Sequence, residues 1–149
     1  MPVDQSFRGR SFPPTRPYEV GREKIREFAD AINDPNPVYR ERAAAQALGY
    51  PDVIAPPTFA IVLTLPAGGE VIRDPAFGLD YSRVVHGEQR FVHHRPIHAG
   101  DLLRVVVSVE DIRQAAGNDI VTTKSDVQTV DGEAVLSAYS TIVARGTAQ

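Results

Sequence analysis

Residues 101–144 alternate apolar and polar side chains over three long segments, and this alternation limits the possible folds more than any other feature of the chain. In residues 101–110 the apolar positions fall on every second residue, at Leu103, Val105, Val107 and Val109. Such a pattern predicts a β-strand with one buried face. Residues 119–130 and 134–144 predict two more strands, and the Asp131-Gly132 pair between them is a strong signal for a tight hairpin.

The rest of the chain adds shorter strand signals and a turn. Residues 79–95 are long enough for one bent strand or two, and residues 18–20 fit a short strand after a proline-rich, extended opening segment. Residues 115–118 predict the turn between the strands at 101–110 and 119–130. The sequence therefore predicts three or four long antiparallel strands.

Two helices are predicted in the first third of the chain. In residues 22–32 the apolar side chains recur at positions i, i+3, i+4 and i+7, which predicts an amphipathic helix that ends at residues 33–35, Asn-Asp-Pro. Residues 40–48 are rich in alanine and predict a short second helix. Gly49 ends it, because glycine readily takes the backbone conformation that follows a helix.

A third, central helix is predicted to begin at Pro56-Pro57 and to stop at Gly68-Gly69. Residues 59–65 are apolar on nearly all sides, so this helix must be buried on most of its surface. A buried strand is the alternative, since Ile61 and Val62 are β-branched. One buried helix followed by long antiparallel strands predicts an α+β fold in which a curved sheet wraps around the helix.

Composition excludes several classes of function. At 149 residues the chain is predicted to form one domain, residues 1–149, with 42% apolar and 23% charged residues, as in globular proteins. A net charge of −3 gives no general reason to bind nucleic acid or membrane, and no cysteine is present for disulfides or thiolate catalysis. The first residues lack an apolar signal core, and no run is long enough to span a bilayer, so a cytoplasmic protein is expected.

Residues 28–59, FADAINDPNPVYRERAAAQALGYPDVIAPPTF, contain the one stretch that points to chemistry. This stretch resembles the motif of MaoC-like (R)-specific enoyl hydratases and 3-hydroxyacyl dehydratases. In that family a Gly-Asp-x-Asn-Pro-x-His turn precedes an alanine-rich helix, and His-Gly-Met then opens the central helix of a hot-dog fold. Without a gap, the turn of the family falls on Asp34, Asn36, Pro37 and Tyr39, and His-Gly-Met falls on Pro56, Pro57 and Thr58.

The resemblance extends over nearly the whole chain. Residues 80–103, DYSRVVHGEQRFVHHRPIHAGDLL, are similar to the second half of the same domain, where a phenylalanine strand leads into a Pro-x-x-x-Gly-Asp turn. The closest likeness is to small actinobacterial subunits that are not catalytic themselves. Such a subunit pairs with a catalytic hot-dog subunit to dehydrate (3R)-3-hydroxyacyl chains on acyl carrier protein in fatty acid elongation.

Two substitutions remove what the family's chemistry needs. Hydration of an enoyl thioester requires an acid/base pair and a donor to the thioester oxygen, which the family supplies from Asp, His and a backbone N–H. Tyr39 stands in the place of the histidine, and a phenol with a pKa near 10 is a poor base at neutral pH. Pro57 has no backbone N–H. The loop is therefore expected to keep its scaffold and to lack the catalytic pair.

Each candidate site residue has a structural and a functional interpretation. In the structural interpretation, Asp34 and Asn36 cap a turn and a helix end. In the functional interpretation, Asp34 is a surviving catalytic carboxylate. Tyr39 either packs against its surroundings or lines a substrate tunnel. Pro57, Thr58 and Phe59 should begin the central helix. They either bind the thioester carbonyl, since helix N-termini attract negative charge, or only cap the helix and pack in the core.

Other polar residues offer alternatives. His86, with Glu88 nearby, is the best replacement base. A basic cluster is either a phosphate- or carrier-binding patch or a solvated edge strand; it comprises Arg90, His93, His94, Arg95 and His98. These histidines lack the spacing and carboxylates of a metal site, and no metal or cofactor is expected.

The sequence thus predicts a protein that binds an acyl thioester, carried by acyl carrier protein or CoA, beside its central helix. It would be the non-catalytic, tunnel-forming half of a dehydratase dimer, with an identical subunit or with a catalytic hot-dog partner. A hydratase or thioesterase active alone through Asp34 or His86 is one alternative. A homo-oligomer that binds a lipid or polyketide without catalysis is the other.

Overall fold

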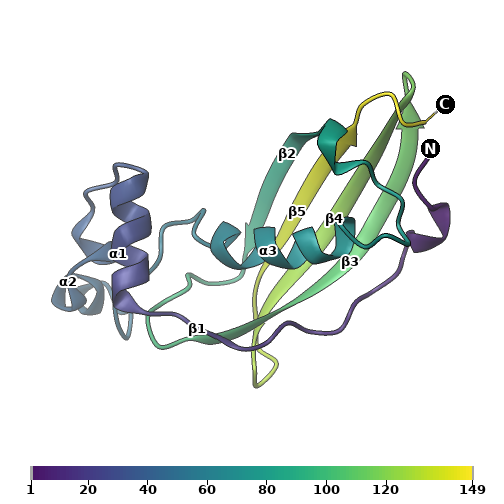
Figure 1. Cartoon of the computed structure of the whole chain (residues 1–149). Helices are drawn as coiled ribbons and strands as arrows, with labels where there is room; N and C mark the ends of the chain where they lie inside the picture. Colours follow the sequence, from purple (N-terminus) through teal and green to yellow (C-terminus); the bar gives the residue numbers. More distant parts are fainter. Residues whose placement is uncertain (1, 149) are drawn as a thin grey trace.

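A computed structural model describes residues 2–148 and shows five antiparallel strands that curve around one helix (Figure 1). The sheet order is β1-β3-β4-β5-β2, with α3 across its concave face and α1 and α2 beyond one end of α3. The predicted α+β fold is confirmed. The strands are β1 (Tyr18–Glu19), β2 (Val84–His93), β3 (Leu102–Ala115), β4 (Asn118–Thr129) and β5 (Ala134–Ala144), and the helices are α1 (Arg22–Ala31), α2 (Arg42–Ala47) and α3 (Ile61–Ile72).

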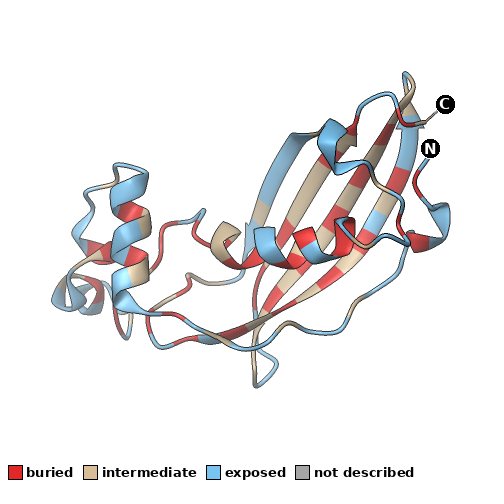
Figure 2. Ribbon diagram, viewed as in Figure 1, coloured by how far each residue is buried: buried red, intermediate tan, exposed pale blue. Residues whose placement is uncertain are grey.

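The meander from β3 to β5 follows the predicted alternation, and buried residues alternate along it in Figure 2. β3 runs five residues past its predicted end. A bulge between Val109 and Asp111 shifts the alternation of side chains by one residue, so that Ile112 faces the core and is fully buried. The turn predicted at residues 115–118 therefore shortens to Ala116 and Gly117, both with positive φ. Residues 79–95 contain a single strand, β2, preceded by a short 3-10 helix.

The predicted bounds of the central helix are wrong at both ends. Residues 57–60 form a turn in which N–H groups bond three residues back, so the regular helix begins only at Ile61. It then continues through Gly68 and Gly69 to Ile72, because packing against the sheet outweighs the cost of about 1 kcal/mol per glycine in a helix. The strand alternative is excluded.

The prediction that α3 is buried on most sides holds in part, because six of its twelve residues are buried and three are exposed. Leu65 is 52% exposed, and Pro66 and Glu70 are exposed as well. The buried face of α3 carries Leu63, Ala67 and Val71, which join the core. One side of the helix therefore packs on the sheet and the other is free in the isolated chain.

The first two helices lie close to their predicted positions. α1 ends one residue before the predicted end. α2 is shorter than predicted, because residues 37–39 form a 3-10 helix and the Pro37 carbonyl accepts bonds from the N–H groups of Arg40 and Glu41. The ring of Phe28 on α1 meets Phe59 edge-on, with centroids 5.5 Å apart, which joins this helical end to the main core.

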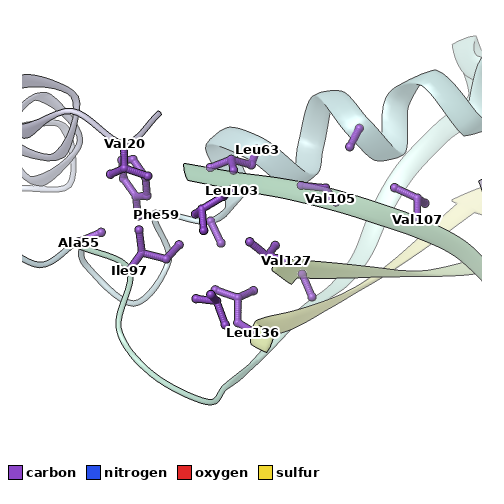
Figure 3. Close-up of a cluster of buried hydrophobic side chains, with 14 of the residues drawn as sticks. Val20, Ala55, Phe59, Leu63, Ile97, Leu103, Val105, Val107, Val127 and Leu136 are labelled. Carbon is purple, nitrogen blue, oxygen red and sulfur yellow. The ribbon is translucent and has the colours of Figure 1, made fainter. Parts of the chain in front are cut away.

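The core fills the space between α3 and the sheet and continues to the start of α3 (Figure 3). Leu63 of α3, Leu103 of β3 and Leu136 of β5 lie within the cluster shown there. Phe59 packs at the same end, near Val20 and Ile97. This arrangement fixes the segment before α3, where the candidate site lies.

Candidate functional site

The loop of residues 34–39 uses its polar side chains to hold its own backbone. The Asp34 carboxylate accepts a hydrogen bond from the Asn36 N–H at 3.1 Å. The Asn36 side-chain oxygen accepts one from the Val38 N–H, also at 3.1 Å, and so caps the 3-10 helix. Both contacts are local turn contacts of the kind that Asp and Asn favour.

Tyr39 is buried, with 8% of its surface exposed, and lines a cavity in front of α3. Burial, and to a smaller extent the negative charge of Asp34, raises the pKa of the Tyr39 hydroxyl above its ordinary value. The shift is away from neutrality, so even less of the Tyr39 side chain than in water is present at neutral pH as the phenolate, the form that could accept a proton. We call this cavity the loop cavity; it is lined by Tyr39, Ile54, Ala55, Pro56, Pro57, His93, His94, Arg95, Pro96 and Ile97.

Residues 57–59 separate in the structure. Pro57 lines the loop cavity, and the Nε2 atom of His93 lies 2.9 Å from the Pro57 carbonyl oxygen, to which it donates. Thr58 is exposed in the turn, where its carbonyl oxygen accepts from the Ile61 N–H. Phe59 is fully buried and belongs to the core. Only Pro57 of these three predicted site residues therefore lines the loop cavity.

His86 lies in a different place from the loop. It is exposed on β2 and lines a second cavity between α3 and the sheet. Glu88, its neighbour in sequence, lies 3.9 Å from Arg90. The structure therefore does not bring His86 together with Asp34 or Tyr39. The second cavity, called here the helix cavity, has a volume of about 130 Å³.

The helix cavity contains polar side chains that the sequence analysis did not select. Thr64 comes from α3, and the other four come from the concave face of the sheet. We call this set the polar band; its members are Thr64, Gln89, Thr123, Ser125 and Ser140. The available signal was the run Val121, Thr123, Ser125, Val127, in which two polar residues interrupt one buried face of a strand.

The basic cluster is largely engaged within the chain. Arg95 forms a two-pronged ion pair with Asp101 at 2.9 Å and also contacts Glu133 at 3.0 Å. The Arg95 guanidinium lowers the pKa of the Glu133 carboxyl. His98 lies 3.4 Å from Asp101, and Arg90 stacks on the ring of Tyr139 at 4.0 Å. These contacts fit an edge strand and a structural network better than a free phosphate-binding patch.

Residues 2–148 show neither a cluster of metal ligands nor a membrane-spanning helix. They contain no group of three or more histidine or acidic side chains placed to hold a metal ion. Within the same residues, every helix is too short or too polar to cross a bilayer.

Comparison with known proteins identifies the class. Residues 6–138 match the model of the family described as FAS1-like, dehydratase domain region. The chain belongs to this family. A UPF0336 protein of Saccharopolyspora erythraea is 62% identical over 149 residues, which cover 100% of this chain and 96% of that protein.

Two solved structures confirm the predicted hot-dog fold and the MaoC-like resemblance. One is the truncated HadBC complex, a (3R)-hydroxyacyl-ACP dehydratase from Mycobacterium tuberculosis. The chain is 34% identical to one of its chains, with a TM-score of 0.83, and the match covers 92% of this chain and 96% of that one. The other is a MaoC-like dehydratase, also 34% identical, with a TM-score of 0.87. That match covers 94% of this chain and 42% of the larger protein.

Proposed function

We propose that the protein is the non-catalytic, acyl-binding subunit of a (3R)-3-hydroxyacyl thioester dehydratase. The observation that carries the proposal is the pair Tyr39 and Pro57 in the loop cavity. A buried phenol with a raised pKa occupies the family's base position, and a residue without an N–H occupies the oxyanion position. Loss of one such donor alone lowers a rate by about a hundred- to a thousand-fold.

Asp34 supports the same reading. Its carboxylate holds the Asn36 N–H, a contact that stabilises the turn whether or not chemistry occurs nearby. A carboxylate without an imidazole partner has no means to relay the second proton of a hydration step. The loop is thus interpreted as a scaffold retained for shape.

An open sheet edge supports a paired assembly. The β2 edge is ten residues long, its residues are mostly exposed, and it hydrogen-bonds to β5 on one side only (Figure 2). Exposed apolar side chains lie on β2, at Val85 and Val92, and on α3, where Leu65 lines the helix cavity. A long edge strand that exposes unpaired backbone groups and apolar side chains favours pairing with a strand of another subunit. The HadBC protein is itself a complex.

Pairing through β2 would place the two kinds of cavity side by side. Edge strands related by a two-fold axis, or an approximate one, run antiparallel. The start of one β2 then faces the end of the other. In this chain His86 near the start of β2 lines the helix cavity, and His93 at the end of β2 lines the loop cavity. The partner's catalytic loop would therefore face this chain's helix cavity.

The thioester substrate is proposed to be carried by acyl carrier protein or by CoA. The helix cavity, at about 130 Å³, is close in size to one that holds benzene, so by itself it has room for a short acyl segment only. The tunnel predicted from the sequence would be completed at the interface by the partner subunit.

Co-expression with a hot-dog protein that keeps an intact Asp-x-Asn-Pro-x-His loop tests the proposal. We expect a heterodimer by native mass spectrometry and dehydration of 3-hydroxyacyl thioesters well above the rate of the partner alone. A mixture no more active than the partner alone would overturn the proposal.

A hydratase or thioesterase active alone is a second candidate, favoured by the position of His86 in the helix cavity. Turnover of enoyl- or acyl-CoA by the purified chain, abolished by His86→Ala or Asp34→Ala, would establish it. A homodimer that carries an extractable lipid or polyketide, without turnover, would instead establish a binding protein.

A further inference from the structure

The polar band forms a continuous patch across three strands beneath α3. In the sheet register, Gln89 of β2 pairs with Ser140 of β5, and Ser140 pairs with Thr123 of β4. The rows on either side are largely apolar: Val121 pairs with Ile142 on one side and Val127 with Leu136 on the other. Ser125 extends the band along β4. On β4 and β5 the hydrogen-bonding side chains are therefore confined to one depth of this face, while on β2 His86 lies in the neighbouring row, opposite Ile142.

Thr64 completes the band from the opposite wall. The residue is 5% exposed, lines the helix cavity, and its hydroxyl oxygen has no hydrogen-bond partner among residues 2–148. Helical threonines often bond the carbonyl four residues earlier, but this hydroxyl makes no such bond. An unpaired buried hydroxyl is destabilising, so its position beside a cavity points to a partner inside that cavity, either a ligand or a water that a ligand can replace.

The convex face of the same strands behaves differently. There Thr122 lies 3.1 Å from Thr141, and Ser137 donates to Asp126 at 2.6 Å. Hydroxyls on that face are thus paired with each other or with a carboxylate. Hydroxyl groups on the convex face, away from the helix cavity, thus have partners within the sheet, whereas the Thr64 hydroxyl in the cavity has none.

We propose that the helix cavity binds an acyl chain that carries a hydroxyl or keto oxygen within its hydrocarbon portion, in preference to a saturated chain. This inference rests on the proposed function and specifies its substrate class. A saturated chain that displaces water would leave the band unsatisfied, whereas a ligand oxygen between Thr64 and the Thr123–Ser140 row satisfies both walls. The cavity opens beside His86 and Gln89, which are exposed on β2, so the chain would enter across the β2 edge.

Titration calorimetry on the full-length chain, alone and in complex with a catalytic hot-dog partner, tests this preference. The probes are dodecanoyl-CoA, hydroxydodecanoyl-CoA isomers with the hydroxyl on successive carbons beyond the sixth, and CoA alone. We expect one isomer to bind about tenfold more tightly than dodecanoyl-CoA, as a hydrogen bond to an otherwise unpaired group provides. Equal or tighter binding of dodecanoyl-CoA would overturn the inference and leave the proposed acyl-binding function standing.

Three variants assign the effect to the polar band. Thr64→Val keeps the side-chain shape without the hydroxyl. We expect it to abolish the preference, because dodecanoyl-CoA then binds more tightly and the hydroxylated isomer loses its hydrogen bond. Thr64→Ser should retain the preference. Thr122→Val, on the convex face, is the matched control and should also retain it. A preference that survives Thr64→Val contradicts the inference.

The remaining outcomes separate the inference from the proposed function. One such outcome is that CoA alone binds as tightly as its thioesters and that Thr64→Val weakens the binding of CoA. In that case the polar band binds the CoA portion of the ligand and the inference is wrong. If no acyl-CoA binds to the chain or to its complex with a catalytic partner, both the inference and the proposed function fail.

Discussion

The polar side chains of the 34–39 loop and those of the helix cavity differ in what they contact. In the loop, Asp34 and Asn36 each hold a backbone N–H two residues away. In the cavity, Thr64 is buried without any partner among the described residues. Polar groups that are satisfied within the chain stabilise it, whereas an unsatisfied buried group is a cost that only a ligand or water removes. We therefore interpret the loop as a scaffold and propose the cavity as a binding site.

The largest effect is expected where the two regions meet, at Phe59. This residue is fully buried between the loop end of the molecule and α3, against Phe28. Phe59→Ala should lower the free energy of unfolding by about 3–5 kcal/mol, as other core aromatic truncations do. Urea unfolding measures this, with Phe59→Leu as the milder control. A loss under about 1 kcal/mol would mean that the residue is not a core anchor.

The loop itself should respond to removal of a cap. Asn36→Ala removes the acceptor for the Val38 N–H and should lower stability by about 1 kcal/mol. Asn36→Ser retains a capping oxygen and is the matched control. An unchanged unfolding midpoint in Asn36→Ala would show that the side chain is not structural and would reopen a functional role for it.

The cavity should respond in the opposite direction. Thr64→Val removes the unpaired hydroxyl at almost constant volume, so the free energy of unfolding should rise by about 1 kcal/mol. Thermal or urea unfolding of the ligand-free protein tests the sign. A destabilised Thr64→Val variant would contradict the assignment of Thr64 as unsatisfied and would remove the basis of the comparison.

The smallest effect concerns Asp52, which anchors the segment leading to the loop cavity. A hydrogen bond from Arg22 at 2.7 Å is the main cause that lowers the pKa of this carboxyl. The ionised Asp52 carboxylate stabilises the fold fully above the ordinary carboxyl pKa of about 4. This stabilisation is lost as pH falls through the lower pKa that the carboxyl has in the folded protein. Asp52→Asn should thus cost up to about 1 kcal/mol near neutral pH.

The same difference in unfolding free energy should begin to shrink below about pH 4, where the unfolded chain takes up the proton. It should vanish only below the lowered folded-state pKa, where the folded wild-type carboxyl is protonated as well. Glu110→Gln, at an exposed carboxylate, is the control. A difference between wild type and Asp52→Asn that is independent of pH would show that the contact does not act through charge.

The sequence predicted the elements whose signals are local. Alternation in β3 to β5 and the Asp131-Gly132 hairpin identified the meander, and the spacing in residues 22–32 identified α1. The bounds of α3 were wrong because Pro56-Pro57 and Gly68-Gly69 are local signals that tertiary packing overrides.

The loop cavity was predictable only in part. A motif resemblance selected Tyr39 and Pro57, which the structure brings to one cavity. It did not select His93, whose contact with Pro57 joins residues 36 positions apart. The polar band was missed for a similar reason, because Gln89, Ser140 and Thr123 become neighbours only through strand register.

Hydration of crotonyl-CoA by the purified chain, without any partner, tests the central claim most directly. With Tyr39 and Pro57 in the loop cavity, we expect the absorbance of the enoyl thioester to fall no faster than in buffer. Rapid hydration by the isolated protein, lost in Asp34→Asn, would show that the 34–39 loop is a working active site and would contradict the account.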